Sequence, residues 1–268
     1  MTRVWSGAAL IVLAVAVVWF APAAIFLAVA FALLLLSVHE LVGLARATGL
    51  NVSIWLPATA SLVTLAAFSI GPRTDGPQAT PLSIALMVQT VAILSAALAG
   101  WTSGNKEVMA RVAVSLFPSL YLALPIGALV AIREVEGPAV LFLLMLTVMV
   151  SDTAQYYTGR LFGRTPLSPA ISPKKTVEGA VGGFVFATIV FTMAGGVWLP
   201  RVPLAFRALV GLTIVALGIA GDLFESMLKR SAEVKDSSSL IPGHGGVLDR
   251  IDALLFAAPI YYVVLQYV

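Results

Sequence analysis

The sequence predicts an all-α, polytopic integral membrane protein with about nine transmembrane helices. Three observations carry this prediction: 60% of the 268 residues are hydrophobic, only 11% are charged, and the mean hydropathy is +1.00. A soluble domain has about a quarter of its residues charged, so that class is excluded. The apolar runs are also too long and too uniform for barrel strands, in which side chains alternate every second residue.

The apolar runs divide into nine segments, because a bilayer core about 30 Å thick needs roughly 20 apolar residues per helix. Clusters of Gly, Pro and charged residues separate them, as expected of turns. The expected spans are residues 4–20, 22–44, 53–70, 81–100, 107–132, 138–160, 175–199, 204–228 and 249–267. No repeat or domain-sized linker interrupts them, so residues 1–268 are expected to form a single membrane domain.

The first apolar run bears on the processing of the chain, and the distribution of basic residues bears on its orientation in the membrane. Arg3 before the first apolar run would suit a cleaved signal peptide, but the next segment is apolar without a pause, so we favour an uncleaved helix. With nine spans, twelve of the sixteen Lys and Arg residues fall on the side of the N-terminus. This bias predicts a cytoplasmic N-terminus and cytoplasmic long polar loops. Without those two loops the sides carry four bases each, so the orientation depends on them.

Charged residues at membrane depth are costly and therefore mark candidate sites. In "SDTAQYYTGRLFG" (151–163), Asp152, Gln155 and Tyr156 share one helix face by their spacing. Asp152 precedes Arg160 by two turns, or about 12 Å at 1.5 Å per residue. We expect Asp152 inside the bundle, facing an aqueous cavity.

A second group is "GDLFESMLKR" (221–230), in which Asp222, Glu225, Ser226 and Lys229 form a polar stripe on an apolar helix. An unpaired Asp within a bilayer is hard to retain for structure alone, so Asp222 is expected to be functional.

The third group is "KDSSSLIPGHGGVLDRID" (235–252), where "PGHGG" cannot continue a helix and Asp249 and Asp252 lie one turn apart on the next one. Paired glycines let backbone N–H groups converge into a nest for an anion, and a helix N-terminus adds positive charge. Carboxylates beside such a nest would repel a phosphate. A Mg²⁺ ion between them resolves the conflict, because Mg²⁺ binds one or two carboxylates together with substrate phosphates.

Basic residues near these acids suit the same phosphate ligand. They are Lys174, Lys175, Lys229, Arg230 and Lys235. The residues alone predict a metal-assisted phosphate site at the cytoplasmic interface without naming the substrate. Ordinary roles stay open: surface lysines also meet anionic lipid, His244 also bonds loop carbonyls, and loop glycines also form plain turns. His39 and Glu40 suit a structural pair or a lateral contact and receive no role.

The run "SMLKRSAEVKDSSSLIPGHGGVLDRID" (226–252) closely resembles the signature of the phosphatidate cytidylyltransferase family, or CDP-diglyceride synthases. The blocks "GDLFES" (221–226), "SDTAQYYTGRLFG" (151–163) and "ISPKKTVEG" (171–179) are similar to family blocks in the same order. The likeness is strong over residues 136–268, the expected catalytic part. Residues 1–135 resemble the family only in hydropathy.

This resemblance implies Mg²⁺-dependent transfer from CTP to phosphatidic acid, giving CDP-diacylglycerol and diphosphate in phospholipid biosynthesis at the cytoplasmic membrane. It implies Asp222 and Asp249 as metal ligands, with a second cation at the same pair. It assigns phosphate contacts and catalysis to Lys175, Lys229, Arg230, Lys235 and Arg250, and matches the signature positions Ser226 and Asp236. The other expected site residues are Lys174 at the membrane surface, Gly243, His244, Gly245 and Gly246 in the nest, and Asp152 and Asp252 as orienting acids.

Several alternatives remain at this point. A relative acting on another lipid, such as a CDP-archaeol synthase or a CTP-dependent polyprenol kinase, would share the site. An ion-coupled transporter would scatter its acids along a path and show repeats, and neither is visible here. Nucleic acid is not an expected partner. The family includes dimers, and the sequence leaves a homodimer open.

Overall fold

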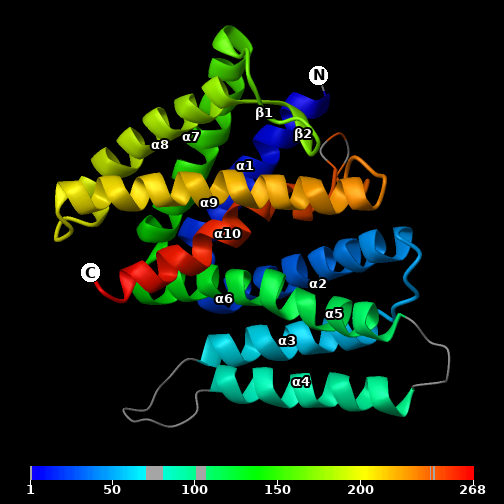
Figure 1. Ribbon diagram of the computed structural model, residues 1–268. Coiled ribbons are helices and arrows are strands. Elements are labelled where there is room, and N and C mark those ends of the chain that lie inside the picture. Colours follow the sequence, from blue (N-terminus) through cyan, green and yellow to red (C-terminus); the bar gives the residue numbers. More distant parts are fainter. Residues whose placement is uncertain (1, 71–80, 101–106, 242, 244) are drawn as a thin grey trace.

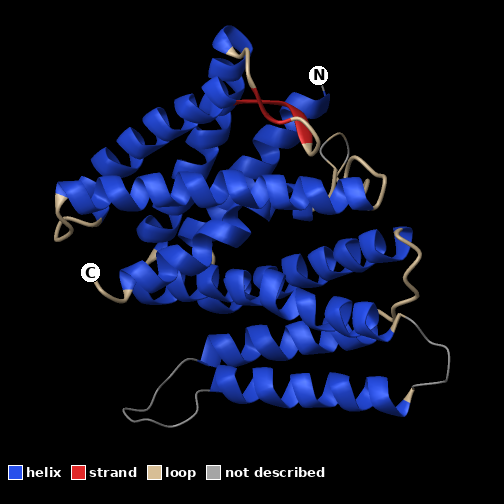
Figure 2. Cartoon of the chain, in the orientation of Figure 1, coloured by secondary structure: helices blue, strands red, loops and turns tan. Residues whose placement is uncertain are grey.

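The computed structural model describes residues 2–70, 81–100, 107–241, 243 and 245–268 (Figure 1). Most of these residues are helical, which confirms the all-α prediction (Figure 2). The helices are Thr2–Phe20 (α1), Ala23–Ala47 (α2), Trp55–Ile70 (α3), Pro81–Ala99 (α4), Val108–Pro118 (α5), Leu124–Ala131 (α6), Pro138–Phe162 (α7), Val177–Trp198 (α8), Leu204–Ser231 (α9) and Leu248–Leu265 (α10).

The fifth predicted span is one helical rod interrupted by π-helical turns. Ser119–Ala123 (η1) joins α5 to α6, and Ile132–Glu136 (η2) follows α6. Pro118 and Pro125 flank η1 and lack the N–H that an α-helix donates to the carbonyl four residues earlier. A wider turn accommodates these missing bonds, so the rod continues through the bundle. Within the described residues, nine helical segments therefore follow the nine predicted spans.

Six of these segments are long and apolar enough to cross a membrane within the described part of the chain. They are Ala23–Ala47, Pro81–Ala99, Val108–Glu136, Pro138–Phe162, Val177–Trp198 and Leu204–Ser231. Residues Ala9–Phe20 and Trp55–Ser69 add shorter apolar helices. Helix α10 begins with the charged residues Asp249, Arg250 and Asp252, and its remainder is apolar. The protein is therefore a multi-pass membrane protein.

One polar loop contains a feature that the sequence did not predict. Pro166–Ser168 (β1) and Ser172–Thr176 (β2) pair as a short antiparallel hairpin between α7 and α8. The expectation that a helix begins at residue 175 is wrong by two residues, because β2 continues to Thr176. The Thr176 hydroxyl then accepts a bond of 3.1 Å from Gly179 N and caps α8. Lys174 and Lys175 are consequently strand residues.

The helices are arranged so that α3 and α4 lie at one edge of the molecule and α7 and α8 at the opposite edge (Figure 1). Helix α9 packs on α8 and on α10, and α10 also packs on α6. Fully buried apolar side chains from several helices form the core, among them Leu34 on α2, Leu122 on η1, Leu144 on α7, Ile214 on α9 and Leu248 on α10. Helices α2 and α9 end, and α10 begins, on the same side of the molecule.

Glycines let α7 and α8 approach closely. A Cβ atom on Gly182 would overlap Thr158, and one on Gly183 would overlap the Gln155 side chain. The Thr158 hydroxyl also lies 3.3 Å from the carbonyl oxygen of Gly179 across this contact. Small residues and interhelical hydrogen bonds are the usual means of joining helices in lipid, where the hydrophobic effect does not act between helices. The two closely packed helices position the hairpin that connects them.

Candidate active site

An ion pair joins the hairpin to α9. The Lys175 ammonium on β2 contacts Asp222 Oδ2. The Ser226 hydroxyl, one turn further along α9, lies 3.4 Å from Asp222 Oδ1. Both members of the pair are partly exposed, with 21% and 29% of their side-chain surfaces accessible. The site residues predicted from two separate sequence blocks therefore meet.

A second lysine lies between two carboxylates from neighbouring helices. Lys229 on α9 contacts Glu225 one turn earlier, and its Nζ lies 2.5 Å from Asp249 Oδ1 on α10. Glu225 is fully buried, and the side chains of Lys229 and Asp249 are 11% and 5% exposed. Two acids thus share one ammonium in a region of low solvent access, where charges need partners.

The second oxygen of Asp249 is held by the loop between α9 and α10, which we call the signature loop (residues 232–247). Asp249 Oδ2 accepts bonds from Ser237 N at 3.0 Å, Ser237 Oγ at 2.9 Å and Gly246 N at 2.8 Å. These three donors fix the carboxylate in one orientation, and they leave Oδ1 directed at Lys229. Asp249 is thus rigidly placed at the start of α10.

Backbone N–H groups do converge at the start of α10, but protein carboxylates occupy them. Gly246 N donates to Asp249, while Val247 N and Leu248 N donate to the two oxygens of Glu40 on α2. In this structure the anion that the Gly246 N–H meets is therefore a carboxylate, and the phosphate nest stays a prediction. Gly243 and Gly245 adopt φ values of 79° and 78°, which glycine favours. The prediction for His244 lies outside the described residues.

Asp152 and Asp252 gather near Asp222. Asp152 on α7 and Asp252 on α10 both lie within electrostatic range of Asp222 on α9. Asp152 is exposed on α7, whereas the sequence predicted a position inside the bundle. Asp252 lies one turn after Asp249 and is partly buried. Acids from three helices therefore face the same polar region.

A close contact between α9 and α10 sets this arrangement. A Cβ atom on Gly221 would overlap the carbonyl oxygen of Asp252, so the helices can approach this closely only because residue 221 is glycine. Asp222 follows immediately, and its distance from α10 depends on that contact.

The remaining predicted residues lie around this centre. Arg230 is exposed and donates to the carbonyl oxygens of Ile171 at 3.3 Å and Val234 at 3.0 Å, which ties α9 to the hairpin turn. The other exposed members of the predicted set are Lys174, Lys235, Asp236, Gly243 and Arg250. The lysine–carboxylate centre thus runs from the buried Lys229 and Asp249 to the partly exposed Lys175 and Asp222, with a more exposed rim around it.

The predicted metal ligands Asp222 and Asp249 meet lysine side chains in the structure. Asp222 and Asp249 each direct one carboxylate oxygen at a lysine ammonium, and Ser226 adds a hydroxyl. No group of three or more His, Cys, Asp or Glu residues suited to a metal occurs among the described residues. Mg²⁺ takes one or two carboxylates and fills its other positions with water and substrate phosphates, so its binding by Asp222 and Asp249 stays a prediction.

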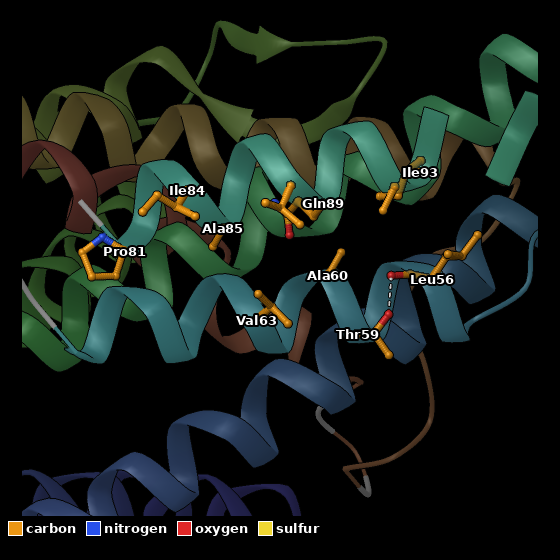
Figure 3. A pocket seen from close by; sticks show the side chains of 11 residues that line it. Leu56, Thr59, Ala60, Val63, Pro81, Ile84, Ala85, Gln89 and Ile93 are labelled. Atoms are coloured by element: carbon orange, nitrogen blue, oxygen red, sulfur yellow. Dashed lines mark hydrogen bonds between the residues drawn. The ribbon is translucent and has the colours of Figure 1, made fainter. Parts of the chain in front are cut away.

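A cavity of about 630 Å³ lies elsewhere, between α3 and α4 (Figure 3). Its lining includes Val63 from α3 and Ile84 from α4, and Gln89 faces into it. The buried Gln89 Oε1 lies 3.0 Å from the Thr64 hydroxyl. None of the predicted site residues lines this cavity, so its apolar surface belongs to the helices of the N-terminal half.

Sequence reasoning missed three contributors to the centre. They are Glu40 on α2 and the hydroxyls of Ser237 and Ser238, which both contact Glu40. Ser237 and Ser238 follow Glu40 in the chain by 197 and 198 residues. The only signal for Glu40 was an acid inside an apolar segment, which marks a site without naming its partner.

Known proteins resemble this chain over roughly half its length. The phosphatidate cytidylyltransferase of Aquifex aeolicus is 39% identical over 151 residues, 56% of each chain. That of Thermotoga maritima is 38% identical over 165 residues, 60% of this chain and 61% of the relative. That of Synechocystis is 46% identical over 133 residues, 48% of this chain and 44% of the relative. The alignments therefore cover about half to three fifths of these relatives.

A family model covers the chain more fully than any of these alignments. The model of the cytidylyltransferase family matches residues 1–268, which includes every element that builds the lysine–carboxylate centre. The chain is therefore a member of the cytidylyltransferase family.

Proposed function

We propose that this protein is a phosphatidate cytidylyltransferase, which converts CTP and phosphatidic acid into CDP-diacylglycerol and diphosphate for phospholipid biosynthesis. The observation that carries the proposal is the centre in which Lys175 meets Asp222 and Lys229 meets Asp249. Relatives that carry this name support the choice of substrates. The reaction brings two negatively charged phosphates together, so its main requirement is charge neutralisation and alignment.

In the proposed reaction, an oxygen of the lipid phosphate attacks the α-phosphorus of CTP in line. The bond between that phosphorus and the oxygen leading to the β-phosphate breaks, and diphosphate leaves with the electron pair. A phosphate monoester is already a competent nucleophile near neutral pH, so the chain does not need a strong general base. Lys175 and Lys229 would contact phosphate oxygens, and the rim residues Arg230, Lys235 and Arg250 would attract the anionic substrates.

Asp222 and Asp249 would hold Mg²⁺, and Asp152 and Asp252 would orient lysines or water around it. When bound, Mg²⁺ would neutralise phosphate charge and align attacking and leaving oxygens, a role that a second cation at the same acids would share. The hydrogen bonds from Ser237 and Gly246 keep Asp249 ready for this task without further rearrangement of the loop.

The proposed location is the cytoplasmic membrane, with the site facing the cytoplasm. CTP is water-soluble and phosphatidic acid is embedded in lipid, so the two substrates meet at the membrane surface. The excess of basic residues on the side of the N-terminus supports this orientation. Association into a homodimer stays a prediction that native mass spectrometry in detergent would check.

The test of this function is an acceptor panel with two differently labelled CTP samples. Purified protein in detergent would receive CTP labelled at the α- or the γ-phosphate, together with phosphatidic acid, an archaeal-type ether-lipid phosphate or a polyprenol. We expect only the α-label to enter lipid, with phosphatidic acid as the preferred acceptor. Preference for the ether lipid would change the substrate, and γ-label in polyprenol would make the protein a kinase.

A further inference from the structure

The structure brings one residue of the N-terminal half into the centre of the signature loop. Glu40 on α2 is 3% exposed, although it is a charged residue inside an apolar span. Four donors lie within hydrogen-bond distance of its carboxylate, two at each oxygen. Oε1 accepts from Ser238 Oγ at 2.7 Å and Val247 N at 2.9 Å, and Oε2 accepts from Ser237 Oγ at 2.9 Å and Leu248 N at 2.8 Å.

These four donors lie at both ends of the signature loop. Ser237 and Ser238 precede "PGHGG" in the sequence, whereas Val247 and Leu248 follow it at the start of α10. Glu40 therefore closes the loop as a clamp from outside it. It also supplies a negative charge to the first N–H groups of α10, which have no partner within the helix.

Ser237 connects this clamp to Asp249. Its hydroxyl oxygen lies 2.9 Å from Glu40 Oε2 and 2.9 Å from Asp249 Oδ2. One hydroxyl hydrogen serves only one acceptor at a time, so the two carboxylates share a single donor. Asp249 Oδ2 already accepts from two backbone N–H groups, so the position of Ser237 is set by both acids together.

The Glu40 carboxylate packs closely against the backbone of the signature loop. A Cβ atom on Gly246 would overlap both the Ser237 hydroxyl and the Glu40 carboxylate. The carboxylate of Glu40 therefore packs directly against the loop backbone at the residue that also binds Asp249. A displacement of Glu40 would be transmitted to Asp249 through Ser237 and Gly246.

We propose that Glu40 is a positioning residue for the transfer reaction, acting through Ser237 and the start of α10 to hold Asp249 in its productive orientation. This inference rests on the proposed function. It explains why an acid is retained in a span of otherwise apolar residues, and it gives the N-terminal helices a direct part in the site. Removing a partner that orients a metal-binding residue lowers metal affinity or activity by about 10- to 100-fold.

The test compares Glu40→Gln, Ser237→Ala and their double variant with wild type, and uses Glu134→Gln as the control. Gln has the shape of Glu, but its amide group presents a donor to N–H groups that need an acceptor. Glu134 is exposed near the opposite end of the bundle, so its substitution should leave all readings unchanged. The first reading is the Mg²⁺ concentration that gives half-maximal cytidylyl transfer, with kcat and KM measured separately.

We expect Glu40→Gln and Ser237→Ala each to raise that Mg²⁺ concentration by about 10- to 100-fold, and the double variant to add little, because both changes break one pathway. KM for phosphatidic acid should stay near its wild-type value. A Glu40→Gln variant with unchanged Mg²⁺ dependence, or a fully additive double variant, would overturn the proposal.

The second reading is hydrogen exchange followed by mass spectrometry in the absence of substrates. Peptides that contain Val247 and Leu248 should exchange faster in Glu40→Gln, while peptides from α7 and α8 stay as in wild type. Faster exchange throughout, together with a lower Tm, would make Glu40 merely structural and would refute the positioning role. If wild type forms no CDP-diacylglycerol, the proposed function fails, and the exchange reading alone decides whether Glu40 holds the loop.

Discussion

Lys229 Nζ on α9 lies 2.5 Å from Asp249 Oδ1 on α10, and the same ammonium also contacts Glu225. The lysine therefore holds two acidic side chains from adjacent helices in one place. Because Lys229 and Asp249 are nearly inaccessible to water, neither charge is tolerated without the other. This arrangement couples the stability of the helix pair to the proposed chemistry.

Replacing Lys229 by Met should therefore damage both folding and activity. The variant leaves Glu225 and Asp249 without their cation, and loss of one partner from a buried pair costs about 3–5 kcal/mol. We expect a clear drop in Tm, followed by fluorescence in detergent, and no measurable cytidylyl transfer. Adding Glu225→Gln should recover part of the Tm without recovering activity. Wild-type activity in Lys229→Met would show that the ammonium contacts no phosphate.

The two hairpin lysines should differ sharply. Lys175 contacts Asp222, whereas the adjacent Lys174 is exposed on β2, where consecutive side chains point to opposite faces. Lys175→Ala should lower kcat/KM for CTP by about 100-fold, as expected for loss of one charge-stabilising donor. Lys174→Ala should change it about fivefold or less, because an exposed charge contributes little. Equal losses in the two variants would contradict this assignment, and steady-state kinetics would decide.

The approach of α9 to α10 offers a matched pair of glycines. A Cβ atom on Gly221 would overlap the carbonyl oxygen of Asp252, whereas one on Gly218 would meet Ala253 Cβ at 3.7 Å, an ordinary contact. Gly221→Ala should therefore push the helices apart and move Asp222 away from α10, with a loss of activity of at least about tenfold. Gly218→Ala should retain activity. Comparable activities in the two variants would show that catalysis does not depend on the close approach of α9 to α10 at Gly221.

A second pair of glycines tests the packing of the signature loop. Gly246→Ala would force Ser237 and Glu40 apart, whereas Gly43→Ala on α2 has no atom within 4 Å of its new Cβ. The first variant should lose activity, and the second should keep it and gain up to about 1 kcal/mol from better helix propensity. Activity assays and thermal unfolding of both variants would check this. An active Gly246→Ala enzyme would mean that the loop can rearrange without cost to the site.

Much of the fold could be predicted from the sequence because lipid imposes a simple rule on length and polarity. All nine predicted spans correspond to helical segments among the described residues. The hairpin at Pro166–Ser168 and Ser172–Thr176 could not be predicted, because strands of three and five residues in a polar loop leave no usable periodicity. The π-helical turns could not be predicted either, since Pro118 and Pro125 indicate an irregularity in the helix but not its form.

The site was predicted in part. Local spacing placed Asp222 and Lys229 on one helix, and the ion pair between Lys229 and Asp249 confirms that the start of α10 lies beside that helix. The roles of these residues stay predictions. The partners of Glu40 could not be predicted, because contacts between α2 and a loop about 200 residues later depend on the packing of the whole bundle. For the same reason, the sequence could not show that the N–H groups of residues 246–248 donate to protein carboxylates.

The central claim is that Asp249 supports a Mg²⁺-dependent cytidylyl transfer at this centre. The most direct measurement is the rate at which α-labelled CTP enters phosphatidic acid over a range of Mg²⁺ concentrations, for wild type and Asp249→Asn. The account predicts no transfer without divalent cation, saturable activity of wild type with Mg²⁺, and a loss of at least about 100-fold in a variant that still folds by its Tm. Transfer at the wild-type rate by folded Asp249→Asn would contradict it.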